Sequence, residues 1–408
     1  MKITAYLGKL QGNARVCTAL FPLWAVPYTV YISYLSLYLQ SKGMDSSQIG
    51  TIMIISNVTA LLSSVIAGTV VDRMGRKAST FVFDLISSAL PALLFLVFPT
   101  YSAAILAMAF SGLNRIMSIG YYALMVEDGD EENGVVSMNL FNVILLLSGF
   151  FIPIAGFVVA KLGIVSSERW FLGISVVCMV TLTLVRNHLT HETEEGERIR
   201  LERKADSNII DGYKKAGLLF LQKGEIRGAV LINALVYTYY GTATTASLFF
   251  ATYYTGYLGF SASQYGVAGG VYTFGTLVSM VCINPHLDRD NLPSSILASC
   301  LVSLAGFLLL IAFPASTPLI MAGTFITALG YGVLKTAGDS ILAITPAGDS
   351  RTTIYALAFM LSSILTIIVL KILTVLYTKF AGWLLLISGI LVLAIACLAI
   401  ILRRRSYD

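Results

Sequence analysis

Long apolar runs constrain this chain more than any other feature of its sequence. A membrane-spanning helix needs about 20 mostly apolar residues. Only 12% of the 408 residues are charged, half the roughly 25% that is typical of soluble domains. Strands of a membrane β-barrel would be about ten residues of alternating polarity, whereas these runs are longer and apolar all round. The sequence therefore predicts an all-α membrane protein with twelve transmembrane helices, at 16–40, 48–71, 79–98, 102–126, 136–160, 170–187, 228–257, 263–284, 294–313, 317–344, 352–378 and 382–402.

The lysines and arginines fall mostly on one side of these spans. With the N-terminus inside, twenty of the 27 are cytoplasmic and three lie within spans. The remaining four are external: Lys42, Lys161, Arg169 and Lys379. Because cytoplasmic loops carry an excess of Lys and Arg, we expect a multi-pass protein of the cell (cytoplasmic) membrane with both termini in the cytoplasm.

The longest hydrophilic stretch divides the spans six and six. It predicts an N-terminal six-helix bundle at 1–187, a cytoplasmic linker at 188–227 and a C-terminal six-helix bundle at 228–408. Apolar residues recur at roughly helical spacing within the linker, which predicts an amphipathic helix on the inner membrane surface; a plain solvated linker is the alternative. These apolar residues are Ile209, Ile210, Tyr213, Leu218 and Phe220.

Several classes of function lack the residues that they would need. The five cysteines lie scattered in apolar runs without metal-ligand spacing, and the three histidines lie outside the spans. The sequence has neither the glycine-rich loop of ATP-driven pumps nor a basic stripe with interleaved aromatic residues for nucleic acid. We therefore expect no enzyme activity, no metal, no cofactor and no nucleic-acid partner. The expected partners are a small-molecule substrate, protons and the lipid bilayer, and we expect a monomer.

The two halves resemble each other after the second span of each. Residues 68–77 read Gly-Thr-Val-Val-Asp-Arg-Met-Gly-Arg-Lys, and 284–293 read Asn-Pro-His-Leu-Asp-Arg-Asp-Asn-Leu-Pro. Both segments therefore carry an Asp-Arg pair at the same place. Six-helix repeats related by an axis along the membrane normal are a known transporter plan, with the substrate near the midplane.

The first of these segments resembles the loop motif of the major facilitator superfamily at every defined position, and it lies in the expected loop. The matching residues are Gly68, Asp72, Arg73, Gly75, Arg76 and Lys77. The resemblance of topology covers the whole chain, and it implies two pseudo-symmetric six-helix bundles, alternating access and a loop that latches the outward-facing state. The second copy keeps Asp288 and Arg289 but lacks the later glycine and cations.

Two roles are expected within this loop motif. Gly68 would let neighbouring helices approach closely, while Asp72 and the cations would act where the two halves could meet. Arg73, Arg76 and Lys77 also suit the simpler role of positive-inside anchors.

The resemblance to the drug–proton antiporter branch covers fewer positions. The fourth span carries Arg115, but the glycine that should follow four residues later stands one place further on, at Gly120. The fifth span keeps Pro153 and Gly156 of a Gly-Pro-Gly pattern, and 16–40 has no acidic residue. This resemblance implies proton-coupled efflux.

Two cations lie inside the spans at corresponding places of the two halves. Arg115 is near the middle of the fourth span, and Lys335 is in the inner half of the tenth. A charge at this depth is costly, so it marks a functional site by default. We expect both to line the central cavity and bind an anionic group or a coupling carboxylate. The alternative is that each cation satisfies groups within its own half.

Acidic residues inside the spans are few. Asp339 follows Lys335 by four residues, which places both on one helix face, and such a pair could exchange its ion pair for a proton. A structural ion pair is the alternative. We expect Asp84 to join the cytoplasmic network of the loop motif, and the acidic run from Glu127 to Glu132 to face water or pair with motif cations.

The remaining cavity candidates combine aromatic rings with polar groups. They are Tyr28, Tyr31, Tyr237, Tyr240, Asn114 and Asn142. Tyrosine offers an apolar face with a polar handle, which suits an amphipathic or aromatic substrate, although each could instead pack between helices. The favoured function is proton-coupled efflux of an amphipathic organic solute by alternating access. An anion or organic-acid transporter that uses Arg115 and Lys335 as a clamp, and a lysolipid translocator, remain as alternatives.

Overall fold

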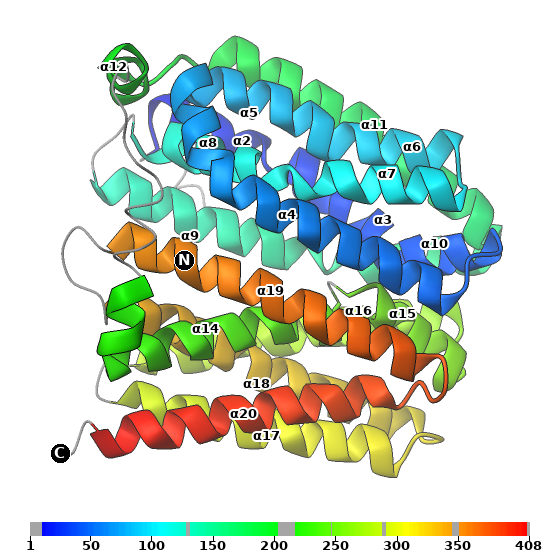
Figure 1. Ribbon diagram of the computed structural model, residues 1–408. Helices are drawn as coiled ribbons and strands as arrows, with labels where there is room; N and C mark the ends of the chain where they lie inside the picture. The colour runs from blue at the N-terminus through cyan, green and yellow to red at the C-terminus, as the bar shows by residue number, and fades with distance from the viewer. Residues whose placement is uncertain are drawn as a thin grey trace. The chain divides into compact units, whose positions relative to one another are not determined.

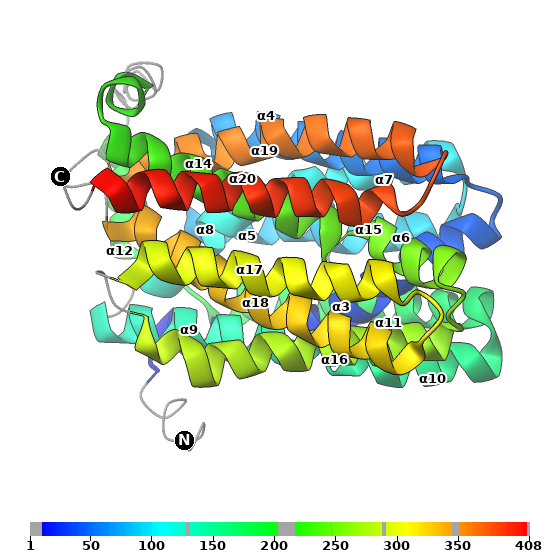
Figure 2. The same ribbon diagram turned by 90° about the horizontal axis from the view of Figure 1, so that it is seen from below.

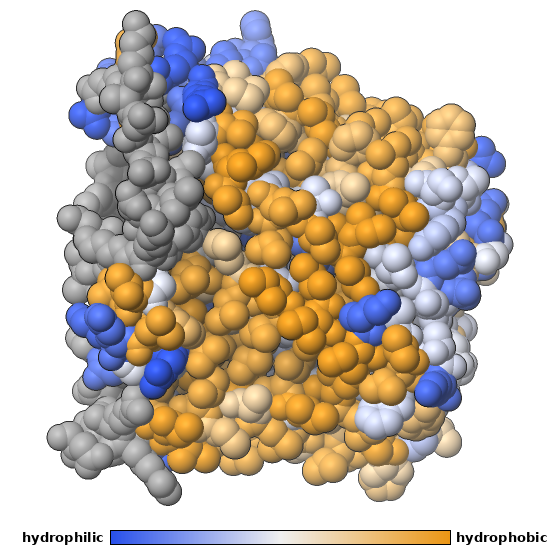
Figure 3. All heavy atoms as spheres, in the orientation of Figure 1, coloured by the Kyte–Doolittle hydropathy of each residue, from blue (hydrophilic) through white to orange (hydrophobic). Residues whose placement is uncertain are grey.

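The computed structural model describes residues 10–127, 131–202, 217–245, 247–287, 291–344 and 351–405. The regular elements of these residues are helices (Figure 1). Eleven continuous or nearly continuous helical segments among them are long and apolar enough to cross a membrane. On the face shown in Figure 3, hydrophobic side chains gather over the middle of the helices and hydrophilic ones gather near the helix ends, as expected of helices that face lipid.

The chain divides into two compact units. Unit 1 comprises Met1–Met44, Ile55–Phe151 and Lys161–Ser207, and unit 2 comprises Asp45–Ile54, Ile152–Ala160 and Asn208–Asp408. The boundaries expected from the sequence, at 187 and 228, stay a prediction.

The helices of unit 1 include the greater part of α4. They are α2 (Gly12–Leu20), α3 (Pro22–Ser41), α4 (Ser46–Met74), α5 (Arg76–Asp84), the π-helix η1 (Leu85–Ala89), α6 (Leu90–Val97), α7 (Tyr101–Gly112), α8 (Asn114–Val126), α9 (Glu131–Ser148), α11 (Ile164–Leu189) and α12 (Glu194–Glu202). Within this unit α11 packs on α3 and α6, and α5 packs on α8.

The helices of unit 2 include the greater part of α10. They are α10 (Phe151–Leu162), α14 (Gly224–Ala243), α15 (Leu248–Thr252), the π-helix η2 (Tyr253–Tyr257), α16 (Ala262–Val278), the π-helix η3 (Ser279–Ile283), the 3-10 helix η4 (Asn284–His286), α17 (Leu292–Ala312), α18 (Thr317–Ile344), α19 (Arg351–Tyr377) and α20 (Trp383–Arg405). Within this unit α17 lies between α18 and α20 (Figure 2).

Local sequence signals begin several of these helices. The Thr100 side chain accepts a hydrogen bond from the N–H of Ala103 and so caps α7. Ser261 and Gln264 form a reciprocal capping box at the start of α16, an arrangement that satisfies two otherwise unpaired N–H groups. Such caps matter here because a helix end without partners leaves polar backbone groups unsatisfied.

Several expected spans differ from the helices found, and three of them bear on the site. The sixth, expected at 170–187, begins six residues earlier, because α11 starts at Ile164. The fourth is broken at Leu113 into α7 and α8. The seventh, expected at 228–257, is α14 followed by α15 and η2, and its tyrosines and polar residues explain why it does not appear among the eleven strongly apolar segments.

The linker contains one described helix that the sequence analysis did not anticipate, α12. The expected amphipathic helix falls largely on residues 203–216, outside the described residues. Residues 217–222 are helical, with Leu218 and Leu221 exposed.

Candidate functional site

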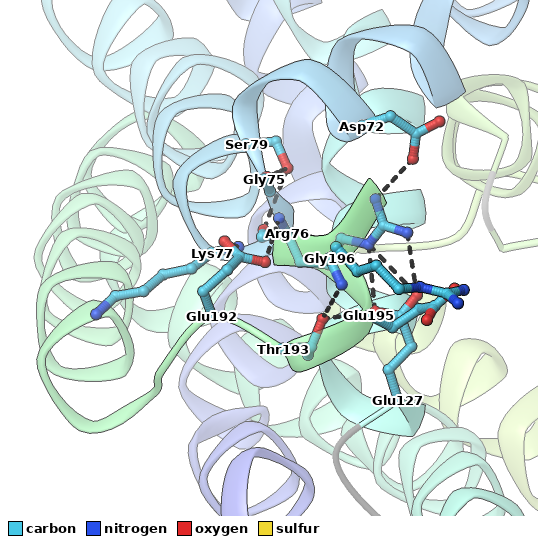
Figure 4. Close-up of polar contacts among 11 residues, drawn as sticks. Asp72, Gly75, Arg76, Lys77, Ser79, Glu127, Glu192, Thr193, Glu195 and Gly196 are labelled. Carbon is cyan, nitrogen blue, oxygen red and sulfur yellow. Dashed lines mark hydrogen bonds and ion pairs between the residues drawn. The ribbon is translucent and has the colours of Figure 1, made fainter. Parts of the chain in front are cut away.

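Arg76 is the centre of a polar network in unit 1 (Figure 4). Its guanidinium bonds the carboxylate of Asp72 at 2.6 Å, one turn earlier in the chain, and that of Glu127 at 3.1 Å. The Nε atom also donates to Glu127, at 3.2 Å. The Arg76 side chain is almost completely buried, so its charge depends on these two carboxylates for compensation.

Glu192, from the linker, holds the other side of the same loop. Its carboxylate accepts hydrogen bonds from the backbone N–H groups of Arg76 at 2.8 Å and Lys77 at 3.0 Å. These are the first N–H groups of α5, where a negative charge is favourable. Gly75, just before α5, has φ +90°, and a Cβ at this position would come within 2.5 Å of the Glu192 carboxylate. The glycine of the motif is therefore required both by the backbone conformation and by the approaching carboxylate.

Thr193 closes the network between the linker and α8. Its hydroxyl donates to Glu127 at 2.6 Å and accepts a hydrogen bond from the N–H of Gly196 at 3.0 Å. A Cβ on Gly196 would collide with Glu192 and Thr193. Contacts around one buried arginine, Arg76, thus join the loop motif to the end of α8 and to the residues just before α12.

Several sequence expectations about this loop can be compared with the structure. Pairing of the acidic run with a motif cation is confirmed for Glu127 and Arg76, whereas Arg73 is exposed. The close helix approach expected at Gly68 is wrong for the described residues, since no atom of theirs lies within 4 Å of a Cβ built there. Asp288 and Arg289 lie outside the described residues.

Asp84 does not belong to this network, contrary to expectation. It pairs with Arg186 at 2.8 Å, and both side chains are buried, at 2% and 4% exposed. The hydroxyls of Thr183 and Ser88 also donate to Asp84, at 3.0 and 3.1 Å, and the Arg186 guanidinium lies 5.3 Å from the centroid of the Tyr121 ring. Arg186 lies within the sixth span expected from the sequence, 170–187, but was counted among the twenty cytoplasmic cations, because its buried partner Asp84 is 102 residues away in the sequence.

The break in the fourth span positions the next two candidates. Asn114 begins α8, where it donates to Ser87 at 3.5 Å and accepts from Ser118 at 3.1 Å. Arg115 follows and is half-buried. The carbonyl of Gly112, freed by the break, accepts from the Ser63 hydroxyl at 3.0 Å. Broken helices at membrane depth need such partners for their backbone groups.

Gly120 is a true close-approach position in the same helix. A Cβ there would come within 2.7 Å of the Ser79 hydroxyl and 2.8 Å of the Thr80 hydroxyl. The glycine that departs by one place from the antiporter pattern thus lets α8 pack on α5.

Unit 2 carries the expected pair of Lys335 and Asp339. The ammonium bonds the carboxylate at 2.9 Å, and the two side chains are 39% and 38% exposed. Asn233 of α14 donates to the other carboxylate oxygen at 3.0 Å. Lys335 lies 5.6 Å from the centroid of the Tyr237 ring. The pair is thus held from two helices yet stays accessible, and its role in transport stays a prediction.

Tyrosines continue from this pair into unit 2. Tyr240 stacks on Tyr331 with a centroid distance of 5.9 Å, and Tyr239 meets Tyr331 edge-on at 5.6 Å. Tyr272 lies beside them, 6.2 Å from Tyr331. Tyr239, Tyr272 and Tyr331 are buried, and their hydroxyls lack a hydrogen-bond partner among the described residues. Buried polar groups in this state suit an additional partner such as water or solute.

The remaining aromatic and polar candidates belong to unit 1. Tyr28 stacks on Trp24 at 4.5 Å and meets Tyr31 edge-on at 5.5 Å. Tyr31 is buried, which favours packing. Asn142 is exposed on α9.

Two polar residues with clear roles in these clusters were missed by the sequence analysis. Glu192 lies in a linker where every acid looks solvated, so no local signal distinguishes it. Asn233 lies in an apolar span, and a single polar residue at that depth is a signal that could have found it. Among the described residues, no group of three or more His, Cys, Asp or Glu side chains is arranged to hold a metal ion.

An all-helical membrane fold with this loop network and charged residues inside its helices defines a secondary transporter of the major facilitator type. The chain belongs to the MFS_1 like family, whose model matches residues 28–365. The fold class expected from the sequence, with two six-helix bundles, is confirmed. No curated protein sequence matches the chain.

Solved structures of transporters share this fold. The nucleoside transporter NupG, in a mutant form, is 14% identical with a TM-score of 0.71, over 96% of this chain and 100% of that one. A bacterial homologue of the human lysosomal transporter Spinster is 13% identical with a TM-score of 0.69, over 98% and 97%. A D-xylose–proton symporter is 14% identical with a TM-score of 0.67, over 93% and 95%. At these identities the likeness concerns the fold alone.

Proposed function

We propose that this transporter exchanges protons for an amphipathic small organic molecule, which it exports by alternating access. The observation that carries the proposal is the accessible ion pair of Lys335 and Asp339. A carboxylate that is paired with one ammonium and one amide can lose the ammonium and gain a proton instead. Arrival of a proton at Asp339 would thereby release Lys335.

The surroundings of the pair support an amphipathic solute. The face of Tyr237 lies near the ammonium, and Tyr240 is 38% exposed. Aromatic faces bind apolar rings and cations, while their hydroxyls bind polar groups. Export as the direction rests on the resemblance to the antiporter branch in Arg115, Pro153 and Gly156.

The same geometry counts against a simple anion clamp. The Lys335 ammonium already has a carboxylate at 2.9 Å, so an anionic substrate would have to compete with Asp339. Arg115, half-buried in the first turn of α8, stays a candidate cation for an anion. The anion transporter therefore remains the second hypothesis, and the test below separates the two.

The test uses purified protein in liposomes with an imposed pH gradient and two probes, the cationic amphipath ethidium and the anion carboxyfluorescein. We expect the gradient to drive ethidium against its concentration difference. Asp339→Asn should retain ethidium binding but lose gradient-driven flux, because an amide cannot take up the proton. Lys371→Ala, which removes an exposed lysine of α19, serves as the matched control.

The opposite pattern would contradict the proposal. Carboxyfluorescein flux that ignores the pH gradient and disappears in both Lys335→Ala and Arg115→Ala would favour the anion clamp. Gradient-driven ethidium flux that is unchanged in Asp339→Asn would remove the pair from the coupling mechanism.

A further inference from the structure

A carboxyl group is buried in unit 1 without a hydrogen-bond partner among the described residues. Glu168 lies in the second turn of α11, and its side chain is 0% exposed. Neither of its carboxyl oxygens has a hydrogen-bond partner among the described residues. Glu168 lies before the sixth span expected from the sequence, which starts at residue 170, whereas α11 begins at Ile164.

The main neighbour of α11, helix α3, brings two tyrosines near Glu168. From α3, the tyrosines at positions 31 and 38 interact with it electrostatically, and both are buried. The Tyr38 hydroxyl donates instead to the carbonyl of Phe95, at 3.5 Å. The other main neighbour of α11, α6, has no ionisable residue.

Among the residues that the structure describes, no buried cation is found to neutralise this carboxyl group. The adjacent Arg169 is exposed. Lys42, which follows α3, is also exposed and lies 5.5 Å from the centroid of the Tyr38 ring. Arg186, the buried cation of the same helix, follows eighteen residues later, about 27 Å along the helix axis at 1.5 Å per residue. That arginine is already paired with Asp84.

A carboxyl group in this position is stable only in its protonated, neutral form. Burial of an uncompensated charge is strongly unfavourable, and the group neutralises instead. If the position served only for packing, an aliphatic side chain would fill a similar volume without burying a polar group that lacks partners. An ionisable group inside a membrane protein is by default a candidate for proton or ion handling.

We propose that Glu168 is a proton-binding site of unit 1, occupied in the described arrangement and emptied when α3 and α11 separate enough to admit water. On release the O–H bond of the carboxyl group breaks, its electron pair stays on the carboxylate, and water accepts the proton. The site is distinct from the Lys335–Asp339 pair of unit 2, and its part in transport rests on the proton coupling proposed above.

The first test needs no substrate. Infrared spectra of the purified protein are recorded in H2O and D2O from acidic to alkaline pH, for the wild type and for Glu168→Gln. We expect the wild type minus mutant difference to contain the C=O band of a protonated carboxyl group, which shifts in D2O and disappears at alkaline pH. Glu195→Gln, an exposed carboxylate of α12, should leave this band in place.

Two results of this test would overturn the inference. One is the absence of the band from the difference spectrum at neutral pH, since Glu168 would then be ionised. The other is a band that neither shifts in D2O nor responds to pH, since the proton would then be permanent and the residue a packing group. The melting temperature of Glu168→Gln should match the wild type, because the amide replaces a neutral acid of the same shape.

The second test separates this inference from the proposed function. In liposomes, Glu168→Gln should keep ethidium exchange without a gradient and lose the part of the flux that the pH gradient drives. Gradient-driven flux that is intact in Glu168→Gln would refute a coupling role for Glu168 while leaving the proposed function standing. Wild-type flux that ignores the gradient, together with an infrared band that titrates, would refute the proposed function while leaving the proton site standing.

Discussion

The carboxylate of Glu192 caps the helix that begins at Arg76, accepting the Arg76 backbone N–H at 2.8 Å. The guanidinium of the same arginine is meanwhile bound by Asp72 and Glu127. One residue of the loop motif thus contacts the linker through its backbone and the ends of α4 and α8 through its side chain. The linker is therefore an integral part of the loop-motif structure.

We expect Glu192→Ala to destabilise the protein by about 1–2 kcal/mol, because a helix cap is lost. Chemical denaturation in detergent micelles measures the change. Glu195→Ala provides the control, since Glu195 pairs with Arg198 on the exposed surface of α12. Equal stability of the two variants would show that the cap contributes nothing.

We expect Asp72→Asn to leave the fold intact, because Arg76 keeps its second carboxylate, Glu127. The contact between α4 and Arg76 would weaken from an ion pair to a hydrogen bond between the charged guanidinium and a neutral amide oxygen. Transport should fall and the conformational balance should shift toward the inward-open state. Distances between spin labels on the cytoplasmic loops measure this balance, and unchanged distributions would contradict a latch.

The buried pair of Asp84 and Arg186 should be far more sensitive than the exposed pairs. We expect Asp84→Asn to cost about 3–5 kcal/mol of stability, because it leaves the buried arginine without a counter-charge. Glu197→Gln removes the partner of Arg200, an exposed pair of α12, and should cost less than about 1 kcal/mol. Unfolding in detergent measures both, and similar costs would mean that Arg186 finds another partner.

We expect Arg115→Ala to abolish transport while the protein still reaches the membrane, and Arg115→Lys to recover only part of it. A guanidinium can hold a carboxylate or phosphate by two parallel hydrogen bonds, whereas an ammonium acts as a point charge. Flux in liposomes and surface expression are measured together. Wild-type flux in the alanine variants of both Arg115 and Lys335 would assign these cations purely structural roles.

The orientation in the membrane is tested by labelling at Leu201, which is 67% exposed at the end of α12. In a cysteine-free background, Leu201→Cys should react with an impermeant thiol reagent only after the cells are opened, since the linker is expected in the cytoplasm. Labelling in intact cells would show that the linker lies outside the cell and that the expected topology is wrong. Substitution at Gly196 is unsuitable, because a side chain there would strike Glu192 and Thr193.

Much of the fold could be predicted from the sequence, because a bilayer imposes a strong and local requirement. Each run of about 20 apolar residues must form a helix to satisfy its backbone, and the loop motif from Gly68 to Lys77 indicated the family. The pairing of Lys335 with Asp339 was also predictable, since residues four apart share a helix face.

The tertiary structure alone decided which distant charges meet. Glu192 and Arg76 are more than a hundred residues apart, as are Arg186 and Asp84, and nothing in the sequence near either acid distinguishes it from a solvated one. Glu168 shows the same limit. The start of α11, six residues earlier than expected, decides whether this residue lies in an exposed loop or inside the helix. The sequence by itself determined the class of this protein, since apolar length and local spacing are written along the chain. The packing of helices decided where each charge is compensated, because compensation depends on neighbours that only folding brings together.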